Sequence, residues 1–194
     1  MDIHILHLKY NRMSDKFRIR FSHGRLTLTN RMDEFAMYRR RSVGWISDPP
    51  AYIHPRILFG SGGPTLTPHF VKTYNITHVI NCAFQDDSPE WFKTAFPSKY
   101  ACLEAVDSTN ANILEWYPMF EETMRKFLSE DGSKVIYIHC QCGINRSGFL
   151  SVLFACIRLN YDCTEVIKSI LSQRPCALTN PAYLKQVKEY CLGV

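Results

Sequence analysis

Long hydrophobic runs are missing from this sequence. No segment approaches the roughly 18 consecutive apolar residues that a membrane-spanning helix requires. The N-terminus also lacks the basic stretch followed by an apolar stretch that marks a secretory signal. The first absence excludes a transmembrane helix. The second predicts an intracellular protein of the cytoplasm, with the nucleus as the alternative compartment.

Paired metal-ligand motifs are also lacking. Cys140 and Cys142 form one close pair, but no second pair of Cys or His residues with zinc-type spacing accompanies it. We therefore expect neither a metal nor a cofactor. The eight cysteines do not indicate a disulfide scaffold, because a chain of 194 residues can fold around its own apolar core. Four of them are expected to act as small buried apolar side chains: Cys156, Cys163, Cys176 and Cys191.

Positive charge is concentrated in the first quarter of the chain. Residues 1–50 contain ten Lys or Arg against five Asp or Glu, whereas residues 51–194 contain thirteen of each. The net charge of +5 therefore belongs to the first segment. Asp48-Pro49-Pro50 marks a join between a basic N-terminal arm, residues 1–50, and a single domain, residues 51–194.

The basic arm has a pattern of its own. Basic and apolar residues alternate from Lys16 to Phe21 before the turn signal Ser22-His23-Gly24, which predicts a β-hairpin, and a short helix capped by Thr29 or Asn30 is expected to follow. The apolar face of the arm could pack on the domain. Alternatively, the arm could bind an acidic substrate or nucleic acid, contact an anionic membrane, or pair two protomers in a homodimer. The sequence leaves these alternatives open.

Residues 135–148 are the most informative stretch. The apolar run Val135–Ile138 predicts a buried strand, and apolar residues recur at helical spacing from Phe149 onward. The loop between them therefore lies at the N-terminus of a helix. Free backbone N–H groups at that end attract anions, which predicts a phosphate-binding loop beside Cys140. The same environment favours the thiolate, so Cys140 is the predicted nucleophile.

Six residues of this stretch match the Cys-x5-Arg-Ser/Thr motif of the cysteine-dependent protein tyrosine phosphatase superfamily: His139, Cys140, Gly143, Arg146, Ser147 and Gly148. The sequence resembles the dual-specificity branch of that superfamily, and its small, poxvirus-type members in particular. The resemblance implies a phosphorylated protein as partner and no cofactor. It also implies a two-step reaction in which Cys140 takes the phosphoryl group and water then hydrolyses the cysteinyl-phosphate.

The resemblance also assigns roles to the loop residues. The planar guanidinium of Arg146 can hold two phosphoryl oxygens at once, and Ser147 is placed to donate a hydrogen bond to the Cys140 sulfur. His139 is expected to brace the loop by hydrogen bonding. The expected phosphate-binding loop consists of Gln141, Cys142, Gly143, Ile144, Asn145 and Arg146.

A general acid is expected upstream of the loop. In this family an aspartate on a separate loop protonates the leaving oxygen, and Asp107 matches it, at the end of the strand-like run Tyr100–Val106. Such an acid contributes about 10²–10⁴ to the rate. Glu104 is the rival carboxylate, but it lies inside that run and is expected to be solvated on the strand face.

The same resemblance covers the chain from Ala51 to its end, about three quarters of it. It implies one α/β domain with a central, mostly parallel sheet flanked by helices. Strands are expected at Ile53–Ser61 and Ile76–Cys82, with a helix between them from Pro64 to Tyr74. Cys82 occupies the position from which some family members form a reversible disulfide with the nucleophile, which would protect Cys140 from irreversible oxidation.

Helical periodicity predicts three further helices. One spans residues 114–128, with Pro118 in its first turn, and another carries Val166 to Leu171 behind a Thr164 cap. The last spans 181–192.

The substrate class is predicted from what the loop lacks. Lipid-acting members carry lysines in the loop, and tyrosine-specific members carry Trp-Pro before the acid, where this chain has Ala105-Val106. RNA 5′-phosphatases share an Asn before the arginine, but Arg174-Pro175 and Asn180-Pro181 resemble the protein-acting branch. Phosphotyrosine and phosphoserine or phosphothreonine are therefore the predicted substrates. The alternatives are an RNA 5′-phosphatase and an inactive phosphate-binding adaptor.

Overall fold

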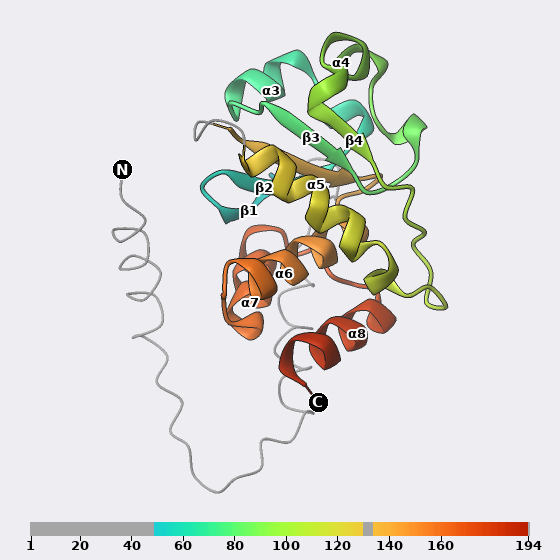
Figure 1. Cartoon of the computed structure of the whole chain (residues 1–194), viewed down its shortest axis with the longest axis vertical. Helices are drawn as coiled ribbons and strands as arrows, with labels where there is room; N and C mark the ends of the chain where they lie inside the picture. The colour runs from blue at the N-terminus through green and yellow to red at the C-terminus, as the bar shows by residue number, and fades with distance from the viewer. Residues whose placement is uncertain (1–48, 130–133, 194) are drawn as a thin grey trace, which may run out of the picture. The chain divides into compact units, whose positions relative to one another are not determined.

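Five strands form one sheet in this computed structural model, which describes residues 49–129 and 134–193 (Figure 1). The hairpin and helix predicted for the basic arm lie outside the described residues. The strand order is β1-β2-β5-β3-β4, and only the β1–β2 pair is antiparallel. This confirms the predicted mostly parallel sheet. The strands are β1 (Ala51–His54), β2 (Ile57–Ser61), β3 (His78–Asn81), β4 (Tyr100–Cys102) and β5 (Ile136–Cys140).

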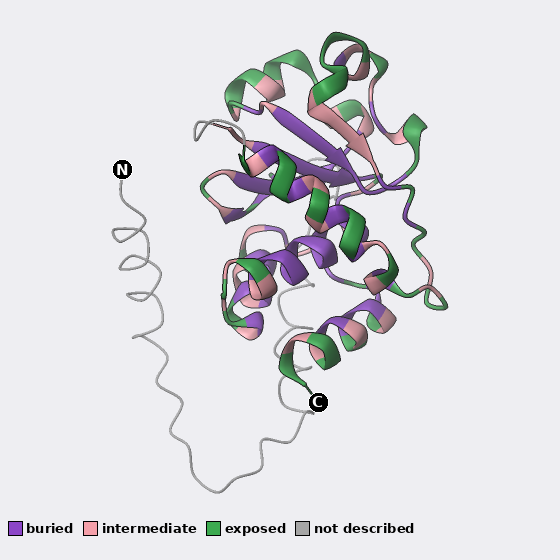
Figure 2. Ribbon diagram, viewed as in Figure 1, coloured by how far each residue is buried: buried purple, intermediate pink, exposed green. Residues whose placement is uncertain are grey.

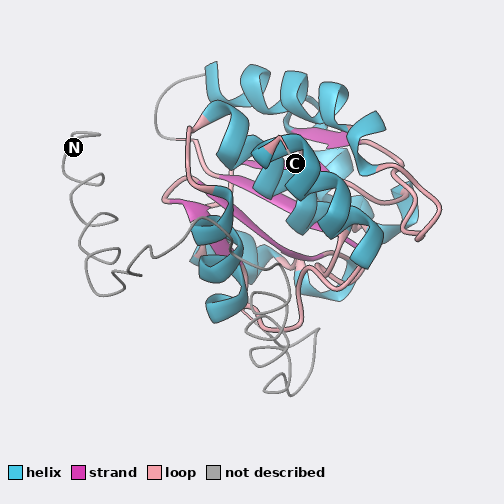
Figure 3. Cartoon of the chain, turned by 90° about the horizontal axis from the view of Figure 1, so that it is seen from below, coloured by secondary structure: helices cyan, strands magenta, loops and turns pink. Residues whose placement is uncertain are grey.

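Helices lie on both sides of the sheet (Figure 3). One side carries α5 (Tyr117–Ser129), α6 (Arg146–Arg158), α7 (Cys163–Gln173) and α8 (Pro181–Leu192). The other side carries α3 (Pro68–Thr73) and α4 (Glu90–Ala95). Short 3-10 turns are η1 (Gly63–Thr65), η2 (Gln85–Asp87), η3 (Pro97–Lys99) and η4 (Ile113–Glu115). No helix of the described residues is long and apolar enough to cross a membrane.

The central strands are buried on both faces, as the purple sheet of Figure 2 shows. Successive side chains of a strand point to opposite faces. In β5, Ile136 and Ile138 therefore join the core under α6, whereas Tyr137 joins the core under α3. Burial on both faces explains why this strand is a continuous apolar run and does not alternate with polar residues.

Helix α6 fixes the position of the site. Every residue from Arg146 to Ala155 is buried, and the helix packs against β2, β5, α5, α7 and α8. Gly148 permits this close packing, because a Cβ there would lie 2.9 Å from a methyl carbon of Leu178. The N-terminus of α6 is thereby held at the end of β5.

Two predicted elements are shorter than expected because of prolines. The run Ile53–Ser61 forms parts of two antiparallel strands, since Pro55 begins a turn between them. The helix expected from Pro64 to Tyr74 is limited to η1 and α3. The residue before a proline favours extended backbone, and Thr67, which precedes Pro68, is extended and caps α3 through a hydrogen bond from the Phe70 N–H.

Two further predictions were wrong in detail. The run Tyr100–Val106 is a strand only as far as Cys102, because its partner β3 ends at Asn81 and Glu104 takes a left-handed φ of 54°. Glu104 is exposed, as expected, but on a loop. The cap of α7 is Asp162 and not Thr164, since the Asp162 carboxylate accepts a hydrogen bond from the Glu165 N–H at 2.9 Å. The helices predicted near 114–128 and at 181–192 are confirmed as α5 and α8.

Candidate functional site

A pocket of about 610 Å³ opens where β5 meets α6. Its walls bring together Cys140, Arg146 and Asp107, with loop residues 141, 142, 144 and 145 beside them. Cys140 is the last residue of β5 and only 2% exposed. The predicted nucleophile, cation and acid thus share one pocket, although Asp107 lies 33 residues before Cys140 in the sequence.

The Cys140 sulfur has a hydrogen-bond donor next to it. The hydroxyl of Ser147, in the first turn of α6, donates to the sulfur at 3.3 Å. Ser147 is itself fully buried, so few other partners compete for its proton. This contact would stabilise negative charge on the sulfur.

Arg146 is a buried cation with an unused donor. It is 6% exposed, and its Nη1 donates to the carbonyl oxygen of Ala105 at 3.1 Å. Its Nε is buried and, among the described residues, has no hydrogen-bond partner. An unpaired buried donor is unfavourable by about 1–3 kcal/mol, more for a charged group. An oxyanion in the pocket would supply the missing acceptor.

The loop turns its carbonyl groups away from the pocket. Five consecutive carbonyl oxygens accept hydrogen bonds from the surrounding framework: those of Cys140, Gln141, Cys142, Gly143 and Ile144. The donors are the Gly62 N–H, the Arg174 guanidinium and the Leu178 N–H. Because N–H and C=O point in opposite directions across a peptide plane, this arrangement leaves the amides free to face an anion.

Arg174 is the main brace of the loop, and sequence reasoning missed this role. It is fully buried, and its Nε and Nη2 donate to the carbonyls of Gly143 and Cys142 at 2.7 and 2.9 Å. Its Nη1 donates to Pro49 at 3.1 Å. The sequence signal was the pair Arg174-Pro175 directly after α7, which resembles the protein-acting branch but does not by itself indicate a contact with the loop.

Gly143 is required by close packing. Its φ is 63°, and a Cβ there would lie 2.1 Å from the carbonyl carbon of Gly60 in β2. Only glycine fits both the left-handed backbone and this contact.

Two amides hold the Asp107 carboxylate at the pocket. The side-chain amide of Asn145 donates to Oδ2 at 3.1 Å, and that of Asn180 donates to Oδ1 at 3.1 Å. The side-chain amide oxygen of Asn145, Oδ1, in turn accepts hydrogen bonds from the backbone N–H groups of Thr179 and Asn180. Asn145 therefore links the phosphate loop to the acid loop, a role that its sequence position alone did not indicate.

Tyr183 supports the same acid loop. Its hydroxyl donates to the carbonyl of Val106 and accepts a hydrogen bond from the Ser108 N–H at 3.4 Å, so it contacts the residues on both sides of Asp107. The ring of Tyr183 packs edge-on against Phe149 of α6. This residue was also missed, and only its place three residues after Asn180 could have indicated it.

His139 is a neutral, buried brace. Its Nδ1 faces the Cys140 carbonyl oxygen at 3.2 Å and must carry the ring proton, so its Nε2 accepts from the Ser88 hydroxyl at 2.6 Å. Burial lowers the pKa of His139 to about 4, although the hydrogen bond to the Cys140 carbonyl opposes that shift. The ring is therefore neutral at physiological pH.

Two further thiols lie near the nucleophile. Cys82 follows β3, and the pairing of Asn81 with His139 places it beside Cys140 on the neighbouring strand. Burial is the main cause that raises the pKa of the Cys82 thiol, and the charge of the nearby Cys140 raises it further. Burial and Cys140 likewise raise the pKa of Cys142, which lines the pocket.

The chain belongs to the family of dual specificity phosphatase catalytic domains, whose family model matches residues 58–191. Mouse dual specificity protein phosphatase 19 is 24% identical over 141 residues, which cover 73% of this chain and 61% of that protein. MAP kinase phosphatase with leucine-rich repeats protein 2 of Dictyostelium discoideum is 26% identical over 151 residues, which cover 76% of this chain and 20% of that protein. The chain thus spans less than two thirds of the length of these curated relatives.

Solved structures share the fold. Human DUSP28 superposes with a TM-score of 0.63 at 16% identity, over 75% of this chain and 94% of that one. The human tyrosine phosphatase-like serine/threonine/tyrosine-interacting protein superposes with a TM-score of 0.57 at 18% identity, over 73% of this chain and 94% of that one. At these identities the likeness concerns the fold alone.

Proposed function

We propose that this domain is a protein phosphatase that hydrolyses phosphotyrosine and phosphoserine or phosphothreonine through a cysteinyl-phosphate on Cys140. One observation carries the proposal. The Cys140 sulfur, with its donor Ser147, shares a pocket with the buried Arg146 guanidinium, whose Nε lacks a partner among the described residues. A phosphoryl group bound there would meet a nucleophile and satisfy the orphan donor. Membership in the dual specificity phosphatase family supports the same chemistry.

In the first step, the Cys140 sulfur attacks phosphorus and the bond to the ester oxygen breaks. Asp107 gives its proton to the departing oxygen. Arg146 and the inward-facing loop amides hold the equatorial oxygens, where charge must be stabilised in the transition state. Neutral Asp107 is required for this step.

In the second step, water attacks the same phosphorus from the side that the leaving group vacated. The Asp107 carboxylate takes the proton of the water, and the sulfur–phosphorus bond breaks. Ser147 donates its hydrogen bond to the departing sulfur and so stabilises the charge that returns to it. Inorganic phosphate then leaves the pocket.

The pocket wall supports an amino-acid substrate. Phe84 and Val106 line the pocket and are 50% and 44% exposed, so each offers apolar surface to whatever carries the phosphate. An aromatic ring can stack on Phe84, and the loop has no lysine for further phosphates of a lipid headgroup. We place the protein inside the cell, where Cys140 stays reduced.

Hydrolysis of a small aryl phosphate tests the proposal. We expect turnover by the reduced full chain, inhibition by vanadate, and no turnover in Cys140→Ser. Cys102→Ser is the matched control, because Cys102 lies on β4 and its sulfur contacts the Ala83 carbonyl at 3.2 Å, a contact that a serine hydroxyl can also make. Phosphopeptide binding without turnover in the wild type would instead identify an adaptor.

A comparison of substrates tests the specificity. Rates should be measured on a phosphotyrosyl peptide, a phosphothreonyl peptide and 5′-triphosphate RNA. We expect both peptides to be hydrolysed faster than the RNA. An RNA rate far above both peptide rates would establish the RNA 5′-phosphatase alternative and overturn the protein substrate.

A further inference from the structure

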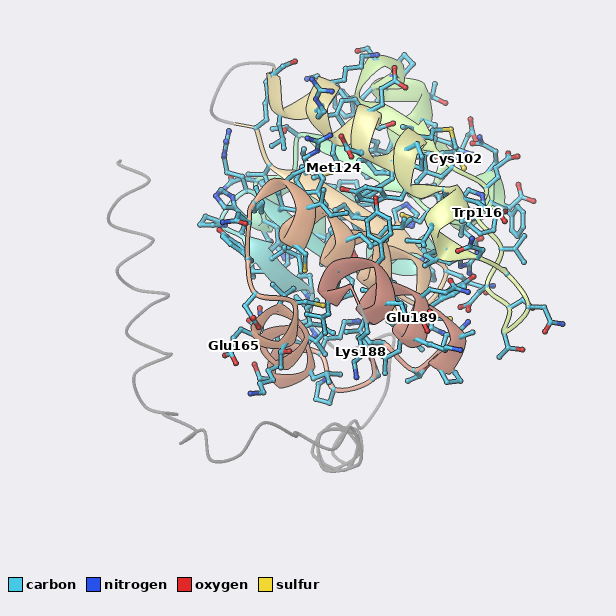
Figure 4. The ribbon with its side chains drawn as sticks, turned by 60° about the horizontal axis from the view of Figure 1, so that its bottom comes forward. Cys102, Trp116, Met124, Glu165, Lys188 and Glu189 are labelled. Carbon is cyan, nitrogen blue, oxygen red and sulfur yellow. The ribbon has the colours of Figure 1, made fainter. Side chains whose placement is uncertain are left out.

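Three cysteines outside the pocket converge on one point. Cys156 lies in the last turn of α6, Cys163 is the first residue of α7, and Cys191 lies in the last turn of α8. Their sulfur atoms all lie within 4.8 Å of one another. Helix α6 packs against both α7 and α8. Figure 4 shows α7 at Glu165 and α8 at Lys188 and Glu189 on the same side of the domain.

The sulfur positions fit a single metal ion. Zinc–thiolate bonds are about 2.3 Å long, so three sulfurs around one ion are about 3.8–4.0 Å apart. In this structure the distances between the three sulfur atoms are at most 4.8 Å, only slightly longer than that spacing. Small side-chain adjustments would therefore bring all three sulfurs into contact with one ion. The three ligands come from three different helices, so a bound ion would link these helices, as a structural metal site does.

We propose that Cys156, Cys163 and Cys191 bind one thiophilic d10 cation, such as Zn²⁺, as three thiolates. Each thiol releases its proton to solvent when it coordinates, and no electron is transferred. Soft sulfur ligands select this class of ion over Mg²⁺ or Ca²⁺. Within the described residues, no His, Asp or Glu joins the group, so the fourth position of a tetrahedral ion would hold water.

The surroundings of the thiols suit this binding. Cys163 is the buried first residue of α7, so the group reaches into the packed interface between the helices. Cys156 and Cys191 are half-buried, which leaves an ion a path to the group. Bound metal would fasten the end of α8 to α6 and α7. The proposed ion is therefore structural, and it is independent of the phosphatase reaction.

A metal titration of the full chain tests this site. All measurements use the Cys140→Ser variant as the parent protein. This substitution removes the pocket thiol that would otherwise compete with the three cysteines for the metal ion. We expect the reduced, metal-free parent to bind one Zn²⁺ per chain by calorimetry and to melt at a higher temperature when loaded. Cd²⁺ as a spectroscopic probe should give a charge-transfer absorption with the intensity of three thiolates.

Variants then identify the ligands. Adding Cys191→Ser should weaken Zn²⁺ binding by at least about 100-fold and reduce the Cd²⁺ absorption by one thiolate. Cys102→Ser, made in the same parent, should change neither. Unchanged affinity in Cys191→Ser would overturn the proposal, and so would a parent that binds no metal or a Cd²⁺ absorption of fewer than three thiolates. The last two readouts need no further variant, so they hold even if Cys191→Ser does not fold.

Discussion

The Arg174 guanidinium donates from Nε to the carbonyl oxygen of Gly143 at 2.7 Å, although 31 residues separate the two in the sequence. The same side chain donates from Nη2 to the preceding carbonyl of the loop, that of Cys142. Because both carbonyls point at Arg174, the amides between Cys142 and Ile144 are fixed in orientation. Arg174 therefore positions the phosphate loop without lining the pocket.

Replacing Arg174 by lysine should weaken phosphate binding as well as the fold. A lysine has no planar fork with which to donate to several carbonyls at once. We expect kcat/KM on an aryl phosphate to fall at least tenfold, and the free energy of unfolding to fall by roughly 2–4 kcal/mol, as when a buried charged network is broken. Steady-state kinetics and urea unfolding measure the two effects.

Vanadate binding separates positioning from mere stability in this variant. If Arg174 orients the loop amides, Arg174→Lys should bind vanadate more weakly at a temperature where it is fully folded. Arg158→Lys is the control, since Arg158 is half-exposed on α6 and pairs with Glu121. An inhibition constant equal to that of the wild type would limit Arg174 to a structural role.

Asp107→Asn should slow turnover in a manner that depends on the leaving group. An amide cannot protonate the departing oxygen, so we expect at least a tenfold loss of kcat on an alkyl or phenyl ester and a smaller loss on an ester whose leaving oxygen needs no proton. Asn180→Ser should act in the same direction more weakly. It keeps a capping side chain for α8 but loses the amide that donates to Asp107. Equal losses on both esters would remove Asp107 from the acid role.

Phe84→Ala should discriminate between the two kinds of phosphopeptide. Phe84 lines the pocket and is half exposed, so a phosphotyrosine ring can pack on it, whereas a phosphothreonine side chain covers little of its surface. We expect the KM for the phosphotyrosyl peptide to rise several-fold and that for the phosphothreonyl peptide to change less. Phe96→Ala is the control, because Phe96 is similarly exposed but lies away from this pocket. Parallel changes for both peptides would contradict the stacking.

The strand, loop and helix around Cys140 could be predicted because their signals are local. An apolar run, a glycine in the following loop and an arginine just before a helical pattern are all visible in neighbouring residues. Whole elements such as α5 and α8 were likewise predicted from their periodicity. Element ends were less predictable: the side chains of Asp162 and Thr164 are both suited to capping a helix, and it is Asp162 that accepts the hydrogen bond from the Glu165 N–H.

The supports of the site could not be predicted from local signals. Arg174 reaches Gly143, and Asn180 reaches Asp107, only after α7 and α8 have packed on α6. The contact between Ser88 and His139 likewise joins residues 51 positions apart. A single sequence shows which residues have the right chemistry, but these pairs form only through long-range topology.

The free energy of unfolding should decrease as the pH is lowered, because of His139. Burial lowers its pKa to about 4 in the folded protein, against about 6.5 in the unfolded chain. The unfolded state therefore binds the proton first as pH falls. The contribution of neutral His139 is fully present above pH 6.5 and is lost as pH falls through 4, and the difference amounts to roughly 3 kcal/mol.

Urea unfolding of the wild type and His139→Asn measures this effect. The difference in unfolding free energy between the two proteins should be largest near pH 7 and should shrink by up to about 3 kcal/mol toward pH 4. An NMR titration of the wild type provides the second readout, with the His139 ring still neutral at pH 5. Parallel pH profiles of the two proteins would contradict the linkage.

Cys82 should protect the nucleophile from irreversible oxidation. Asn81 at the end of β3 pairs with His139 of β5, so Cys82 directly after β3 lies beside Cys140. Neighbouring strands are about 4.8 Å apart, within the Cα distances of about 4.4–6.8 Å that disulfides span. Hydrogen peroxide would convert Cys140 to a sulfenic acid. The Cys82 thiol would then attack that sulfur, and a disulfide and water would form.

Electrostatics favours this order of events. The Cys140 charge helps to raise the pKa of Cys82, so oxidation of Cys140 to a neutral sulfenic acid removes one cause that keeps Cys82 protonated. We expect dithiothreitol to restore most activity to peroxide-treated wild type and a several-fold smaller fraction to Cys82→Ala. Cys102→Ala, on the far side of β3, should recover like the wild type. Equal recovery in all three proteins would mean that Cys140 is oxidised and reduced without help from Cys82.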